Sequence, residues 1–171
     1  AALGRLVPIK RLDAFIDMVA GDNELRGDLL GDGPLRRALR ERAQRRCQDR
    51  VRLLGAREDA ASLLPAYDAV VLPSVREGCP LVAVEAFAAS VPVVGFDVPG
   101  VRDALSSLGR GLLVPPEEGA GGLRRAVRRL RQDPALRAEL VDQAAAGARA
   151  CRPAVVAAAL AESYRRSLRS R

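Results

Sequence analysis

The stretch YDAVVLPSVREGCPLVAVEAFAASVPVV, residues 67–94, decides the fold of this chain. It contains two short apolar runs, residues 69–73 and 91–94, separated by an alanine-rich segment that begins at Pro80, where proline can open a helix. Both runs are apolar throughout, which is typical of strands covered on both faces. The order strand, helix, strand therefore predicts a β-α-β unit with parallel strands.

The same alternation of apolar runs and helical patterns extends over the whole chain. Strands are predicted at residues 1–6, 25–30, 51–55, 69–73, 91–96 and 110–116. Helices are predicted at residues 11–20, 34–47, 60–67, around Glu85, and at 123–132, 134–150 and 153–168, with a loop at 119–122. We therefore expect an α/β fold in which residues 1–171 form a single domain. Its core would be a Rossmann-like, doubly wound parallel sheet of about six strands with helices on both faces and C-terminal helices.

The composition excludes several classes of function. The 171 residues are 49% hydrophobic and 29% charged, contain no histidine, and carry three scattered cysteines, Cys47, Cys79 and Cys151. We therefore expect no zinc site, no Ser-His nucleophile and no histidine acid–base chemistry. No apolar run approaches the roughly 18 residues of a membrane span, and the first residues have the pattern of a strand. A cytoplasmic protein is expected, with the inner face of the membrane as the place for any peripheral attachment.

The chain is strongly basic, with a net charge of +7 and a pI near 10.5. Its arginines stand mostly on helical segments and alternate with acidic residues, as in RRALRERAQRRCQDR at residues 36–50. This pattern predicts a solvated basic face, or one turned toward a partner domain or an anionic membrane surface, and no nucleic-acid partner. Lys10 is the only lysine, which indicates a position where a compact ammonium has a specific task.

Charged residues gather in the loops that follow the predicted strands. Arg5 and Lys10 follow the first strand, and Glu77 follows the fourth. In a doubly wound sheet, ligands bind beyond the carboxyl ends of the strands. Turn chemistry explains the glycines and prolines of these loops, but not three charged side chains at one edge. We interpret this edge as a binding site.

The loop SVREGCPL, residues 74–81, leads into a helix N-terminus, whose free amides and dipole favour an anion. Gly78 allows the backbone to approach a ligand closely. Glu77 is either an acceptor for ligand hydroxyls or a helix-capping residue. Glu85, one to two turns into the helix, either binds a vicinal diol or is ion-paired with a neighbouring arginine.

Together these residues specify a ligand. Arg5 would grip a phosphate in its fork and Lys10 would add a mobile point charge, so that with the helix amides they surround a diphosphate. Glu85 would bind a diol on one side and Glu77 a sugar-like group on the other. A ligand with these parts is a nucleotide-sugar.

The chain resembles the C-terminal, donor-binding domain of the retaining family-4 glycosyltransferases of GT-B fold. The resemblance covers essentially the whole chain, and Glu77 and Glu85 match the family's E-x7-E motif. Five motifs occur in the family's order: GRLVPIKRLD, GDGPLRRAL, VRLLG, YDAVVLPSVREGCPLVAVEAFAASVPVV and DVPGVRD. The last motif departs from the family pattern, with one glycine and Asp103 where a glycine pair and a glutamate are common.

The resemblance implies a role for each matching residue. Arg5, Lys10 and Glu77 would be the catalytic residues, with the two cations stabilising the leaving nucleoside diphosphate and Glu77 contacting the donor sugar. Glu85 would bind the ribose hydroxyls. The other donor-binding positions would be Gly78, Cys79, Pro80, Leu81 and Val82 at the diphosphate (Pro80 without an amide to offer), Ala56 and Arg57 at the base, and Gly31 at a turn near the nucleotide.

The resemblance also implies transfer of a sugar from a UDP- or GDP-linked donor, with retention of anomeric configuration and without a metal or cofactor. We expect the N-terminal acceptor domain to lie outside this chain, which alone would bind nucleotide weakly and not turn over. Two alternatives stay open: a non-catalytic nucleotide-sugar-binding or regulatory Rossmann-like module, and a nucleotide-sugar epimerase. The arginine-rich, alanine-rich composition favours a bacterial protein of polysaccharide biosynthesis.

Overall fold

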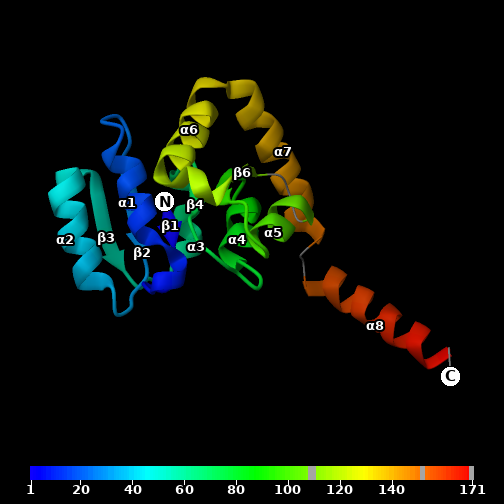
Figure 1. The fold of residues 1–171 in the computed structure, drawn as a ribbon. Helices are drawn as coiled ribbons and strands as arrows, with labels where there is room; N and C mark the ends of the chain where they lie inside the picture. The colour runs from blue at the N-terminus through cyan, green and yellow to red at the C-terminus, as the bar shows by residue number, and fades with distance from the viewer. Residues whose placement is uncertain (108–110, 151–152, 170–171) are drawn as a thin grey trace.

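A computed structural model describes residues 1–107, 111–150 and 153–169 (Figure 1). This part of the chain contains six short strands, all paired in parallel. They are β1 (Ala2–Leu3), β2 (Gly27–Leu30), β3 (Val51–Gly55), β4 (Val70–Leu72), β5 (Val93–Phe96) and β6 (Leu112–Val114). Their pairing gives two three-stranded sheets, with the orders β1-β2-β3 and β4-β5-β6.

The two sheets meet edge to edge along β1 and β4. The Ala1 ammonium donates to the Ala69 carbonyl at 2.7 Å, and the Val71 amide donates to the Ala1 carbonyl at 2.8 Å. The strands therefore follow the spatial order 3-2-1-4-5-6. In this order the direction of winding reverses between β1 and β4, as in a doubly wound sheet. The predicted α/β architecture is confirmed.

Helices cover both faces of this arrangement (Figure 1). The α-helices are α1 (Leu12–Ala20), α2 (Arg36–Cys47), α3 (Ala60–Leu63), α4 (Leu81–Ala88), α5 (Val101–Ser107), α6 (Gly119–Gln132), α7 (Pro134–Ala150) and α8 (Pro153–Arg169). Short 3-10 helices are η1 (Pro8–Lys10), η2 (Gln48–Arg50), η3 (Leu64–Ala66) and η4 (Pro116–Glu118). One group consists of α1 packed against α2 and α6, and the other of α4 packed against α5 and α7.

The last helix, α8, extends away from the body of the domain (Figure 1). It exposes Val155, Val156, Leu160 and Tyr164, which lie near one another at helical spacing. None of the described helices is by itself long and apolar enough to cross a membrane, whereas α7 and α8 meet these criteria only as a bent pair.

The apolar runs form a core that is closed on both faces of the strands. Every residue of β2, β4 and β5 is buried, and β3 coincides with the predicted run at residues 51–55. From α1, Phe15, Ile16 and Val19 pack into this core with at most 1% of their surface exposed. Continuous apolar character therefore identified the buried strands correctly. Arg110, predicted to begin the last strand, and Cys151 lie outside the described residues.

Two elements, α6 and α5, differ from the prediction. Residues 119–122, expected as a loop, are the first turn of α6, and α5 was not predicted. Gly122 in this turn serves packing, since a Cβ atom on it would lie only 2.5 Å from Cγ1 of Val114. The missing side chain allows α6 to approach β6 closely.

The buried strand β2 carries an ionised side chain in its interior. The Asp28 carboxylate, in a residue only 5% exposed, accepts hydrogen bonds from the Arg52 guanidinium at 2.7 and 2.6 Å and from the Tyr67 hydroxyl at 2.9 Å. The hydrogen bonds from Arg52, and in second place that from Tyr67, hold the pKa of Asp28 below its ordinary value although burial opposes them. Burial and Asp28 raise the pKa of Tyr67 to about 12, so its hydroxyl stays protonated as a donor.

We expect Tyr67→Phe to destabilise the fold by about 1–2 kcal/mol at neutral pH, because a buried carboxylate loses one donor. Because the pKa of Asp28 is lowered in the folded state, its ionised carboxylate stabilises the fold fully above its ordinary pKa of about 4. This stabilisation is lost as the pH falls through the lowered pKa. The loss of stability caused by Tyr67→Phe should therefore be smaller at acidic pH than at neutral pH. Urea unfolding at about pH 7 and about pH 3 measures this.

The matched control is Tyr164→Phe, which removes a hydroxyl from an exposed site on α8 and should leave stability unchanged. Equal losses for the two variants, or a Tyr67→Phe loss that does not depend on pH, would contradict the role given to Asp28.

Candidate functional site

The loops that follow β1 and β4 lie against each other at the carboxyl edge of the sheet. The Val75 amide donates to the Ile9 carbonyl at 3.0 Å and joins the two loops directly. The loop after β5 supports them, because Gly100, at φ 80°, is so close that a Cβ atom there would stand 2.1 Å from the Glu77 carbonyl oxygen. Since winding reverses between β1 and β4, this is the edge at which doubly wound sheets bind ligands.

Lys10 and Glu77, which the sequence predicts at one edge, form an ion pair there. Lys10 ends η1, and its Nζ lies 2.6 Å from Oε1 of Glu77. The Ser74 hydroxyl donates to the same oxygen at 2.6 Å. The side chain of Glu77 is 10% exposed and that of Lys10 25%. Pairing compensates the cost of holding a carboxylate at this depth.

The helix α4 presents an uncapped N-terminus beside this ion pair. Pro80 is the N-cap residue, and no side chain caps the helix, so Glu77 is not the capping residue that one interpretation made it. Within the described chain, the amides of Cys79, Leu81 and Val82 have no hydrogen-bond acceptor. Free amides at a helix N-terminus create a positive potential that attracts anions.

A cavity of about 230 Å³ brings these groups together. It is lined by Leu3, Lys10, Leu72, Glu77, Cys79, Pro80, Leu81 and Val82, six of which are predicted site residues. Gly78 lies between the lining residues Glu77 and Cys79, and no atom lies within 4 Å of the place where its Cβ would stand. The cavity therefore combines a cation, a carboxylate and free amides, with open space at Gly78.

Glu85 lies in the second turn of α4 and is exposed. It forms no ion pair with any described residue, so the interpretation that it is held by a neighbouring arginine has no support in the structure. Position 85 is one helical turn from the free amide of Leu81. Its carboxylate is available to a ligand.

The remaining predicted residues do not line this cavity. Arg5 follows β1 and is exposed, without an ion pair in the described part of the chain. Gly31 follows β2 at φ 136°, where a Cβ would stand 1.9 Å from the Gly4 carbonyl oxygen, so it has the geometry of a tight turn. Ala56 and Arg57 follow β3 and are exposed, with Arg57 paired to a nearby aspartate at 2.6 Å. All four thus lie at strand carboxyl ends.

Sequence reasoning missed Ser74. The residue stands in the stretch that decides the fold, after Pro73 at the end of β4, but serine is common in turns. The available signal was its spacing, because a hydroxyl three residues before Glu77 in a tight loop can reach that carboxylate.

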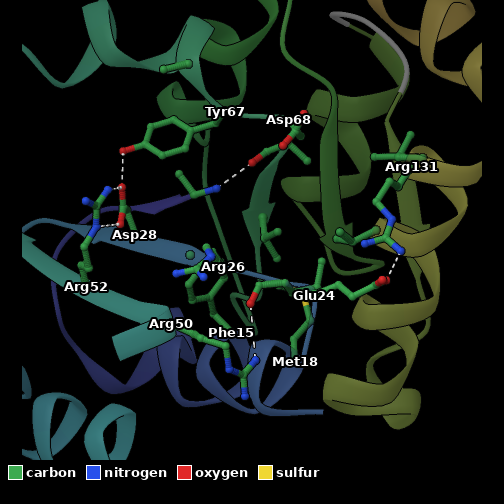
Figure 2. A pocket seen from close by; sticks show the side chains of 18 of the residues that line it. Phe15, Met18, Glu24, Arg26, Asp28, Arg50, Arg52, Tyr67, Asp68 and Arg131 are labelled. Carbon is green, nitrogen blue, oxygen red and sulfur yellow. Dashed lines mark hydrogen bonds and ion pairs between the residues drawn. The ribbon is translucent and has the colours of Figure 1, made fainter. Parts of the chain in front are cut away.

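A second cavity, of about 550 Å³, lies elsewhere (Figure 2). It is lined by residues that begin β1 and β2, among them Ala1 and Asp28, and so opens at the amino edge of the strands. Acidic side chains in its wall are engaged with basic ones: Asp28 as described above, and Glu24 with Arg131 (Figure 2). We assign the ligand site to the opposite edge, where the helix amides are free.

Sequence comparison finds relatives among sugar-transferring enzymes. The family model "Glycosyl transferases group 1" matches residues 1–133. Alpha-D-kanosaminyltransferase of Streptomyces kanamyceticus is 31% identical over 150 residues, which are 84% of this chain and 39% of that protein. The lipopolysaccharide core biosynthesis glycosyltransferase LpsD of Rhizobium meliloti is 33% identical over 139 residues, 81% of this chain and 40% of that protein. The chain thus spans less than half the length of these relatives.

Solved structures show the same fold. HepE of Anabaena in complex with UDP matches with a TM-score of 0.83 and 26% identity, over 99% of this chain and 48% of HepE. HepE in complex with UDP-glucose matches with a TM-score of 0.81 and 25% identity, over 99% of this chain and 49% of HepE. With the family model matched over residues 1–133 of 171, the chain belongs to the glycosyl transferases group 1 family, as the resemblance predicted.

Proposed function

We propose that this chain is the donor-binding half of a GT-B glycosyltransferase, which binds a nucleotide-diphospho-sugar and transfers its sugar with the help of a separate acceptor-binding domain. The observation that carries the proposal is the meeting of Lys10, Glu77 and the free amides of α4 at one cavity. Two comparisons support it: HepE has been solved with UDP and with UDP-glucose, and the relatives are more than twice as long as this chain.

In this proposal the diphosphate lies at the N-terminus of α4. The amides of Leu81 and Val82 would donate to phosphate oxygens, while Arg5 and Lys10 would offset the negative charge that develops on the leaving group. Cationic groups at the leaving group can take the part that a divalent ion plays in other transferases. We therefore propose transfer without a bound metal.

The two glutamates of the E-x7-E motif would hold the sugars. Glu85, exposed and unpaired among the described residues, would accept hydrogen bonds from the ribose diol, and Glu77 from the hydroxyls of the transferred sugar. The motif favours retention, in which the acceptor attacks the anomeric carbon on the face that the diphosphate leaves. The charge of the oxocarbenium-like transition state would be balanced by the departing diphosphate.

Calorimetry of this chain against UDP, GDP and other nucleoside diphosphates tests the proposal. We expect weak binding of one of them, and Glu85→Ala should weaken that binding by about 1–3 kcal/mol because charged hydrogen bonds to the ribose are lost. Thermal stability should not change, since Glu85 has no partner in the described chain.

Glu41→Ala serves as the matched control, because Glu41 is an exposed glutamate on α2 in a surface ion pair with Arg37. It should leave nucleotide affinity unchanged. A chain that binds no nucleoside diphosphate would contradict the proposed function, and equal affinities of Glu85→Ala and the parent chain would remove Glu85 from the site.

Gly78→Ala tests whether the ligand lies against this loop. The new methyl group meets no protein atom within 4 Å and the backbone is not left-handed there, so the fold should keep its stability. Nucleotide affinity should fall by about 1–3 kcal/mol, because the methyl group would crowd the bound diphosphate. Gly121→Ala in α6 is the control, and unaltered affinity in Gly78→Ala would place the ligand elsewhere.

A further inference from the structure

We propose that Ser74 is a positioning residue for Glu77, whose carboxylate it holds toward the donor sugar once the diphosphate has engaged Lys10. This inference rests on the proposed function of the site. Its basis is that Ser74 and Lys10 both bind one oxygen of Glu77, while only one of these two partners is able to reach a ligand.

The Ser74 hydroxyl is a fixed donor. The residue is 1% exposed and stands directly after Pro73 at the end of β4, so its backbone is anchored to the sheet. Its Oγ lies 2.6 Å from Oε1 of Glu77. An ionised carboxylate only accepts hydrogen bonds, so the hydroxyl is the donor, and a bond of this charge-assisted kind is strong.

The two donors leave the second oxygen of Glu77 free. Nζ of Lys10 and Oγ of Ser74 both lie 2.6 Å from Oε1, and no described residue donates to Oε2. Within the described chain, the only side-chain nitrogen or oxygen that is sealed from solvent without a partner is Oε1 of Gln143, so Oε2 of Glu77 is not sealed from solvent. Since Glu77 lines the cavity, Oε2 is the oxygen that a sugar hydroxyl can use.

Lys10 and Ser74 will respond differently to a diphosphate. Lys10 is 25% exposed, carries its charge on a flexible stem and lines the same cavity, so an arriving anion competes with Glu77 for it. Ser74 is buried and does not line the cavity, so its hydroxyl cannot move to the phosphates as Lys10 can. When Lys10 turns to the phosphates, Ser74 becomes the one donor among the described residues that still fixes the rotation of the Glu77 carboxylate.

The ratio of two affinities measures this role. UDP lacks the sugar and UDP-glucose carries it, so the affinity for UDP-glucose divided by that for UDP reports the contact made by Glu77. By calorimetry on the full chain, Ser74→Ala should lower this ratio about tenfold, as expected for a lost hydrogen bond to a charged group. Ser74→Thr keeps the hydroxyl and should restore the ratio. Ser106→Ala, at an exposed position of α5, should not change it.

A double-mutant cycle separates positioning from a general effect on the fold. If Ser74 acts through Glu77, then Ser74→Ala added to Glu77→Gln should cause no further change in the ratio. An unchanged ratio in Ser74→Ala, or a loss that adds fully to that of Glu77→Gln, would overturn the role of Ser74 while nucleotide binding by the parent chain still supported the proposed function. If another nucleoside diphosphate is the one that binds, the ratio is measured with it and its glucose conjugate; a parent chain that binds no nucleoside diphosphate would overturn both.

Discussion

The site depends on the junction of β1 and β4. Two backbone hydrogen bonds through Ala1 place the first strand of one sheet beside the first strand of the other. The loops after these strands therefore share an edge, and Lys10 and Glu77, 67 residues apart in the sequence, come within 2.6 Å of each other. The loop that contains Gly100 packs closely against the backbone of Glu77 and supports it at this edge of the sheet. Without this junction the cation, the carboxylate and the helix amides would belong to separate surfaces.

The sequence predicted the parts of the fold that are governed by continuous apolar character. The run at residues 51–55 is a strand to the residue although Arg52 within it is exposed, whereas Val70–Leu72 and Val93–Phe96 lie within their predicted runs and are buried throughout, as expected of strands covered on both faces. The first turn of α6 was mistaken for a loop because it is rich in glycine, and the close contact of Gly122 with β6 is not revealed by local sequence. Helix α5 is short and follows a turn motif, so its own pattern was too brief to recognise.

The sequence predicted that the site residues lie at the carboxyl edge of the sheet, but not which of their side chains contact each other. Parallel strands bring their carboxyl ends together, so residues after the first and fourth strands could be assigned to one place. The sequence assigned Lys10 to a phosphate and Glu77 to a sugar as separate tasks, whereas in the structure they bind each other. Such pairing depends on side-chain positions set by three loops, and the same is true of the contribution of Ser74.

Much of the basic character of the chain serves contacts between its helices. Arg42 on α2 binds Asp17 on α1 at 2.5 Å, and Arg128 on α6 binds the buried Asp22 at 2.5 Å. Exposed pairs of this kind contribute little each, but Asp22 is 4% exposed and needs its partner. Some of the arginines that alternate with acidic residues thus link α2 and α6 to α1 and to the turn that follows it.

The ion pair at the cavity has a consequence for selectivity. While Lys10 is paired with Glu77, the site attracts an anion mainly through the helix amides. A phosphate that draws Lys10 away leaves the Glu77 carboxylate, 10% exposed, with the Ser74 hydroxyl but without its cation. A molecule that brings hydroxyls together with its negative charge satisfies both halves of the separated pair at once. Under the proposed function, the ion pair therefore favours a nucleotide-sugar over an anion that brings no hydroxyl to Glu77.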